Sequence, residues 1–309
     1  VMGIILPILF IFFFLMHNLE KEKLKKLYLL IPYLFFCSIF TIIFWPFLWE
    51  DPSRIIDSFT SMSNYDYRGE VFFNGKYFVA KYIPWYYLPI TILITTPISY
   101  IVIFFVGSFF ILKKSNINLI NLDIRGGNIW KNNLDLFTIY STVIVYFTII
   151  VIIELNSTLY NGWRQVFFIY PSIIFILIYG LNNLFSYKKF KKYIYIFIFI
   201  SIFSNLYWVI HNHPYQYAYY NSFITKKNIK NFELDYWGVS NLQMLNKLME
   251  LRQRDNYKVH VFSVSPYYLS LNMINNNYVK SFSFVKNIDD AEFIFSNHFY
   301  QSIQINFEN

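Results

Sequence analysis

The chain has 309 residues, of which 56% are hydrophobic and 23% aromatic, and its formal net charge is +8. The single cysteine, Cys37, excludes an internal disulfide. The chain also lacks a glycine-rich phosphate loop and a Cys and His spacing suited to zinc, so we expect neither a cofactor nor a metal ion. Most of the excess positive charge lies in short connectors between apolar stretches, where it indicates membrane topology and not nucleic acid binding.

Six apolar stretches, each close to twenty residues, fill the first two-thirds of the chain. A helix rises about 1.5 Å per residue, so roughly twenty residues cross the hydrocarbon core of a bilayer. Since backbone groups find no water there, each stretch must be a helix. The predicted spans are Val1–His17, Leu27–Trp49, Tyr86–Leu112, Leu136–Leu155, Val166–Phe185 and Tyr193–Ile210.

The connectors alternate in charge, and this alternation predicts the orientation. Three of them carry twelve basic residues, namely Lys21, Lys23, Lys25, Lys26, Lys113, Lys114, Arg125, Lys131, Lys188, Lys189, Lys191 and Lys192. The two intervening loops carry five, namely Arg54, Arg68, Lys76, Lys81 and Arg164. Because Lys and Arg stay on the cytoplasmic side, segments 50–85, 156–165 and 211–309 are predicted to face outward. We therefore expect a multi-pass inner membrane protein, with a transmembrane domain at 1–210 and an extracytoplasmic domain at 211–309.

The first residue is Val1 and not an initiator Met, and it opens inside a hydrophobic run. A signal peptide would show a basic start and a shorter apolar core, and this sequence has neither. We therefore expect the chain to be a fragment, the C-terminal part of a longer protein.

The first outward loop predicts a short amphipathic helix. Ser53 can cap it, and the apolar residues that follow fall on one side, namely Ile55, Ile56, Phe59 and Met62. Aromatic residues flank the loop at both ends, namely Trp45, Trp49, Trp85, Tyr86 and Tyr87. The loop is either a surface segment tethered by aromatics or a site where a lipid-linked substrate meets a water-soluble one.

The second outward loop places Arg164 where the chain re-enters the membrane, between Tyr160, Trp163 and the fifth span. A guanidinium at this depth can pair with a lipid phosphate through its bidentate fork, or it can simply reach the headgroups. Glu154, at the outer end of the fourth span, is a possible partner.

The tail predicts a small α/β domain. Ser240 can cap a helix whose apolar face is formed by Leu242, Leu245, Leu248 and Met249. A strand is predicted at 258–264, a helix start at Ser265–Pro266, and further strands at 278–285 and 292–296.

Four polar residues of the tail are candidates for a site but have structural explanations. His211 and His213 lack a third ligand nearby, so we interpret them as junction residues. Glu233 and Asp235 are interpreted as capping or hydrogen-bonding partners that anchor the domain.

Four runs of the sequence carry a family resemblance, namely PWYYLPITILITTP, YNGWRQVFFIYP, HPYQYAYYN and FELDYWG. Together they resemble bacterial C-type polytopic membrane glycosyltransferases, related to protein O-mannosyltransferases and the lipid A aminoarabinose transferase. These are glycosyltransferase family 39, or dolichyl-phosphate-mannose–protein mannosyltransferase-like proteins. The resemblance covers the chain from the first outward loop onward. The family pattern has Asp and His where this chain has Asn161 and Gln165.

The resemblance implies a hexosyltransferase-type enzyme that takes a sugar from a polyprenyl-phosphate-linked donor on the extracytoplasmic face of the lipid bilayer. The family's acidic catalytic motif lies near its N-terminus and no position here matches it, so we expect the catalytic residues upstream. Position and chemistry, and not a family match, make Arg164 the first candidate to bind the donor phosphate, with Lys81, Tyr160 and Trp163 beside it.

A non-catalytic membrane protein is the alternative, either a scaffold or a transporter segment with an outer domain. A transporter should show broken helices or polar groups at the midplane, and the fourth span offers only Ser141, Thr142 and Thr148. The sugar and the acceptor are not indicated by the sequence.

Overall fold

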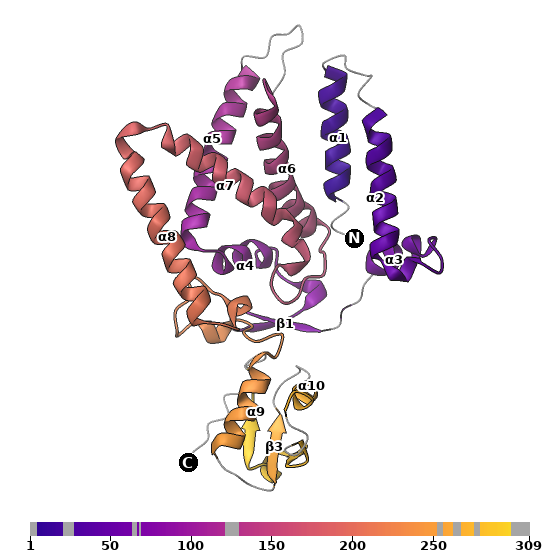
Figure 1. Cartoon of the computed structure of the whole chain (residues 1–309), viewed down its shortest axis with the longest axis vertical. Coiled ribbons are helices and arrows are strands. Elements are labelled where there is room, and N and C mark those ends of the chain that lie inside the picture. Colours follow the sequence, from indigo (N-terminus) through magenta and orange to yellow (C-terminus); the bar gives the residue numbers. More distant parts are fainter. Residues whose placement is uncertain are drawn as a thin grey trace. The chain divides into compact units, whose positions relative to one another are not determined.

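A computed structural model of the chain describes residues 5–20, 28–63, 67, 69–120, 130–251, 256–261, 267–274 and 279–297. It is mostly helical, with a small strand-containing region at the C-terminal end (Figure 1). Within the described residues, four helical segments are long and apolar enough to cross a membrane: Ile98–Ile120, Asn133–Glu154, Arg164–Phe185 and Lys188–His211.

The first two predicted spans also form apolar helices, but these are shorter. Helix α1 covers Ile5–Glu20 and α2 covers Leu30–Phe44. Some of the predicted features lie outside the described residues, namely Lys21, Lys23, Lys25, Lys26, Arg68, Arg125 and Ser265–Pro266.

The third predicted span, Tyr86–Leu112, is not one helix. Helix α4 covers Tyr87–Thr95, and α5 covers Ile98–Ile120. Thr96 between them is extended (φ −106°, ψ 139°), as expected for a residue before proline, and Pro97 has no N–H with which to continue the ladder of α4. The apolar run was too uniform to show this break by hydropathy, although Pro97 itself is a helix-breaking signal.

The contacts divide the chain into two compact units. Unit 1 comprises Val1–Tyr67, Ile98–Leu159 and Trp163–Ile200, and unit 2 comprises Arg68–Pro97, Tyr160–Gly162 and Ser201–Asn309. The boundary between 210 and 211 stays a prediction.

In unit 1, α7 (Tyr170–Phe185) packs against both α5 and α6 (Asn133–Glu154) (Figure 1). Two glycines allow the backbones of α5 and α7 to approach closely. A Cβ atom at Gly107 would lie 2.2 Å from the carbonyl oxygen of Ile176, and one at Gly180 would lie 2.8 Å from the Cα atom of Gly107. This crossing was not predicted, since each glycine is inconspicuous in its own apolar run.

The side chain of Trp49 caps the C-terminal end of α2. The Trp49 indole N–H donates to the carbonyls of Ile42 (2.9 Å) and Ile43 (3.2 Å), near the C-terminus of the helix. The 3-10 helix η3 (Pro46–Leu48) lies between α2 and Trp49, and it buries Leu48 completely. Trp49 thus satisfies carbonyls that have no partner within the helix.

The predicted amphipathic helix is confirmed as α3 (Arg54–Ser63), with Ile55 and Ile56 exposed. Its predicted cap differs, because both the N–H and the hydroxyl of Ser53 donate to the Asp51 carboxylate. These bonds, together with the positive charge of Arg54, lower the pKa of Asp51 below its usual range. The backbone carbonyl of Asp51 accepts from Arg54 at the start of the helix (3.2 Å).

Unit 2 begins with a hairpin of β1 (Glu70–Phe73) and β2 (Lys76–Val79), antiparallel with Phe73 opposite Lys76. Asn74 (φ 52°) and Gly75 (φ 75°) form its turn, a conformation that Asn and Gly adopt readily. The hairpin is followed by η4 (Ala80–Tyr82) and α4.

The hairpin is joined to the segment that precedes α9. Phe73 makes an antiparallel bridge with Phe232, and the Gly75 N–H donates to the Asn231 carbonyl at 2.9 Å. This segment also contains the 3-10 helices η7 (Gln216–Ala218) and η8 (Ile229–Asn231). The hairpin, which lies in the second half of the first predicted outward loop, and the segment before α9 therefore belong to the same folded unit.

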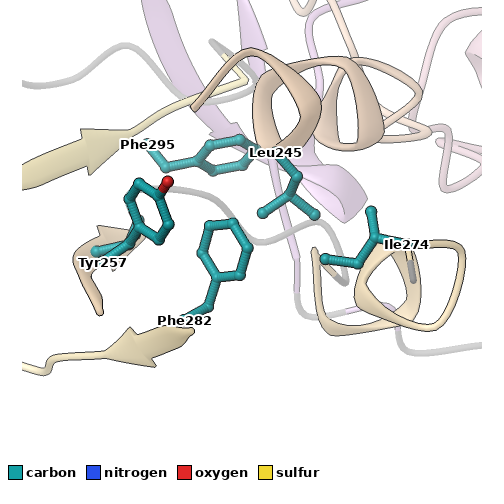
Figure 2. Packing of buried hydrophobic residues seen from close by; sticks show 6 residues of the cluster. Leu245, Tyr257, Ile274, Phe282 and Phe295 are labelled. Atoms are coloured by element: carbon teal, nitrogen blue, oxygen red, sulfur yellow. The ribbon is translucent and has the colours of Figure 1, made fainter. Parts of the chain in front are cut away.

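The C-terminal region is a small α/β fold, as predicted. It comprises α9 (Ser240–Leu251), β3 (Tyr257–Val261), α10 (Tyr267–Leu271), β4 (Phe282–Phe284), η9 (Ile288–Asp290) and β5 (Phe293–Phe295). The strands form a parallel sheet in the order β4-β3-β5. The side chains that form its core point toward one another (Figure 2): Leu245, Tyr257, Ile274, Phe282 and Phe295.

Candidate functional site

The turn that precedes Arg164 has a fixed, left-handed backbone. Asn161 has φ 53° and Gly162 has φ 75°. Asn and Gly are the residues that adopt this region at least cost, so Asn161 has a conformational reason to occupy its position. The Gly162 N–H donates to the Tyr87 hydroxyl at 3.1 Å, and Leu159 before the turn is 1% exposed. The turn is thus held at both ends.

Arg164 opens the 3-10 helix η5 (Arg164–Ile169), which leads directly into α7. Val166 and Ile169 are fully buried, so this helix is anchored in the core of unit 1. Arg164 itself is half-buried. An Arg keeps its charge at any physiological pH, so a cation is presented from a rigid element at the head of α7.

Trp163, the residue before Arg164, is packed among aromatic rings. Its indole is 7% exposed, with its ring centroid 4.9 Å from that of Phe167 and 6.1 Å from that of Tyr170. The rings of Phe167 and Tyr170 are in turn stacked at 5.0 Å. Trp163 is therefore immobilised in unit 1.

The other two predicted site residues belong to unit 2. Tyr160 is half-buried at the start of the Asn161–Gly162 turn. Lys81 is exposed in η4, in a segment where Tyr82 (74% exposed) and Trp85 (69%) are exposed as well. A lysine among exposed aromatics is typical of a membrane interface. Grouping these two residues with Arg164 in one site stays a prediction.

Of the carboxylates predicted to face outward, Glu154 is exposed at the last position of α6. Glu233 and Asp235 are buried, at 8% and 7% exposure. The Glu233 carboxylate accepts from the Phe72 N–H of the hairpin at 3.1 Å. Tyr220 donates to the Glu233 backbone carbonyl (2.8 Å), and burial together with the Glu233 charge raises the pKa of the Tyr220 phenol.

Asp235 caps helix α9, and the predicted capping role of Ser240 is wrong in detail. The carboxylate accepts from the backbone N–H groups of Val239 (2.9 Å) and Ser240 (3.0 Å), and the Ser240 hydroxyl donates to it as well. The Tyr217 hydroxyl also donates to Asp235, and burial and this carboxylate raise the pKa of the phenol. The prediction that Asp235 acts as a cap is confirmed.

We expect Asp235→Asn to lower the free energy of unfolding by about 1.5–3 kcal/mol, because an amide removes the charge and one acceptor from a buried, charge-assisted network. Thermal unfolding followed by circular dichroism measures the change. Asp289→Asn, at an exposed position of the same unit, is the control. An Asp235→Asn protein that unfolds at the wild-type midpoint would contradict the structural role.

His211 and His213 each contact a side chain close to them in sequence. His211 stacks on Tyr207 with ring centroids 5.6 Å apart, and a His213 ring nitrogen lies 2.9 Å from the Gln216 amide nitrogen. In the part of the chain that the structure describes, no three His, Cys, Asp or Glu side chains come close enough to hold a metal ion.

One polar residue of unit 2 was missed by the sequence analysis. Asn221 is 3% exposed, and its side-chain amide donates to the carbonyls of Leu93 and Thr96, each at 2.7 Å, while its backbone N–H donates to Ile94 (2.8 Å). It thus satisfies carbonyls left open where α4 stops before Pro97. Its only signal in the sequence is a tyrosine-rich context.

No protein-family model, no curated protein and no solved structure matches this chain. Any assignment of function therefore rests on the motifs and the geometry described above.

Proposed function

We propose that the chain is part of a C-type membrane glycosyltransferase of the family 39 group, which transfers a sugar from a polyprenyl-phosphate-linked donor on the extracytoplasmic face of the inner membrane. Six spans would carry the outward segments, with the acidic catalytic motif upstream. The mostly helical fold, with four helices able to cross a membrane, is compatible with this class. Support for the sugar chemistry comes from the four sequence motifs in their order.

The observation that carries the proposal is the placement of Arg164. It follows a turn of left-handed backbone geometry, begins a helix anchored by buried Val166, and comes directly after Trp163, whose ring packs on Phe167 and Tyr170. When a sugar leaves a lipid phosphate, charge grows on the phosphate oxygens. A preorganised guanidinium stabilises this charge without having to reorganise during the reaction.

Replacing Arg164 tests this role in the protein that contains this chain. Charge-assisted hydrogen bonds contribute about 1.5–3 kcal/mol, so Arg164→Ala should lower kcat/KM roughly ten- to a hundredfold. Arg164→Lys should recover only part of the loss, since Lys keeps the charge but not the bidentate fork. Lys76→Ala, at an exposed cation of the hairpin, is the matched control. Wild-type turnover and donor affinity in Arg164→Ala would show that Arg164 is a headgroup anchor.

The proposed topology is tested separately by cysteine labelling in a Cys37→Ser background. Ser61 and Ser222 are exposed and predicted to face outward, whereas Asn116 is exposed and predicted to face the cytoplasm. An impermeant maleimide applied to intact cells should label cysteines at the first two positions and not at the third. Labelling at 116 without permeabilisation would overturn the orientation. Ser270 is a poor position for this test, because it is 9% exposed.

A non-catalytic scaffold is the second candidate, favoured by one observation. Both buried carboxylates of the tail, Glu233 and Asp235, already accept structural hydrogen bonds. A chain in which these two carboxylates have only structural roles can anchor an outer domain to a membrane without catalysing a reaction. Under this reading, Arg164→Ala would leave every activity of the full-length protein unchanged.

A further inference from the structure

At one end of the helix bundle in unit 1, lysines from two connectors lie close together. Lys113 and Lys114 lie in the last third of α5, and Lys131 lies just before α6. Lys188 and Lys189 form the short η6 helix (Lys188–Phe190) between α7 and α8 (Lys191–His211). Figure 1 shows the end of α5, the start of α6 and the α7–α8 turn at the same end of the bundle.

Side-chain contacts support this placement. From the Gly107–Gly180 crossing, α5 and α7 continue toward this end, where the rings of Phe110 and Tyr187 lie 6.4 Å apart. Tyr187 directly precedes Lys188, and Lys114 is one helical turn beyond Phe110. The lysines of η6 therefore lie near those of α5.

A buried carboxylate organises the α5–α6 side of this end. Asp135, with 3% of its side chain exposed, forms an ion pair with Lys114 and accepts from the Lys131 backbone N–H at 3.3 Å. Asn132 accepts from the Asp135 N–H (2.9 Å) and caps α6. This acid balances the charge of Lys114, which is 42% exposed, and fixes the start of α6 against the end of α5.

Four further lysines at this end have exposed side chains: Lys113, Lys131, Lys188 and Lys189. Among the described residues, the ion pair found at this end is the one between Lys114 and Asp135. A surplus of positive charge thus surrounds the point where α5, α6 and the α7–α8 turn meet. Oxygens of a phosphodiester headgroup would complement it.

We propose that this end of the bundle binds the headgroup of an anionic phospholipid, from the leaflet in which these helix ends lie. In the proposed topology this is the cytoplasmic leaflet, which is rich in such lipids. The headgroup would bridge Lys113 and Lys131 on one side to Lys188 and Lys189 on the other. The inference is independent of the sugar chemistry.

The bound headgroup would help to hold α8 in place. No residue of η6 or α8 is buried. At its start, the Tyr195 ring contacts Phe185 of α7, with centroids 4.9 Å apart, and Lys191 lies over the same Tyr195 ring. A lipid phosphate bound by η6 would hold the α7–α8 turn against α5 and α6.

The test is lipid titration of the purified chain, followed by native mass spectrometry, with phosphatidylglycerol and phosphatidylcholine as probes. Wild type should bind phosphatidylglycerol more tightly, and Lys188→Gln/Lys189→Gln should weaken this binding roughly fivefold for each lysine removed. Lys188→Arg/Lys189→Arg should retain it. Lys226→Gln/Lys227→Gln, an exposed pair in unit 2, is the control and should behave as wild type.

Two outcomes would overturn the proposal. The first is equal affinity of the wild type for the two lipids, and the second is an equal loss in the control pair. Salt dependence of wild-type binding provides a check that needs no folded variant. Rising ionic strength must weaken phosphatidylglycerol binding if exposed lysines hold the headgroup, and binding insensitive to salt contradicts this.

Discussion

Gly107→Ala is expected to prevent α5 and α7 from packing, although it adds a single methyl group. That methyl would lie 2.2 Å from the backbone carbonyl oxygen of Ile176 and close to the Ile176 side chain. Because this oxygen belongs to the backbone of α7, the clash is removed only if the two helices move apart. Overpacking in a closely packed interior costs about 1–3 kcal/mol and occasionally more, and this crossing joins two candidate spans.

The measurement is the fraction of monodisperse protein after detergent extraction, together with its thermal unfolding midpoint. Gly180→Ala should show the same defect, since its Cβ would lie 2.8 Å from the Gly107 backbone. Val102→Leu, which enlarges a half-exposed side chain of α5, is the control and should have no effect. A Gly107→Ala protein with wild-type yield and midpoint would show that α5 and α7 do not cross at these glycines.

Asn221→Asp is expected to be the most damaging isosteric change in unit 2. It removes both side-chain hydrogen bonds to the carbonyls of Leu93 and Thr96, and it places an acceptor against these two carbonyl oxygens, of which that of Thr96 is buried and that of Leu93 partly buried. Each unsatisfied buried group costs about 1–3 kcal/mol, so the expected loss of stability is about 2–6 kcal/mol.

Thermal unfolding and limited proteolysis measure this loss, and cleavage after residues of α4 should appear early. Asn246→Asp makes the same chemical change at an exposed position of α9 and should be neutral. If Asn221→Asp proves as stable as the control, the end of α4 is satisfied by other groups.

The sequence predicted the elements whose signals are local. The six apolar runs correspond to four helices long and apolar enough to cross a membrane and two shorter apolar helices, because a bilayer requires a minimum length of apolar helix. Strands β3 and β5 were predicted close to their observed positions, since each combines aromatic or β-branched residues with polar flanks. Strand β4 (Phe282–Phe284) covers only the second half of the predicted strand at 278–285. The break at Pro97 was not predicted, because the apolar run continues on both sides of the proline.

The contacts that tie distant segments together could not be predicted in this way. The bond from Phe72 to Glu233, and the bonds from Asn221 to the end of α4, join residues far apart in the chain. The Gly107–Gly180 crossing depends on the relative placement of two helices, which no single window of sequence encodes. At the candidate site, the sequence identified Arg164 by its place between aromatics and a span, while the bond from Gly162 to the Tyr87 hydroxyl joins residues far apart in the chain.

The measurement that tests the proposed function most directly is a transfer assay with the full-length protein that contains this chain, reconstituted in vesicles with a labelled polyprenyl-phosphate sugar. The proposal predicts that label leaves the lipid fraction for an acceptor fraction, and that one polyprenyl phosphate is released for each sugar transferred. It also predicts that Arg164→Ala slows this release while the protein stays folded. Folded protein that leaves the label on the lipid, across a panel of protein, lipid and glycan acceptors, would contradict the assignment as a glycosyltransferase.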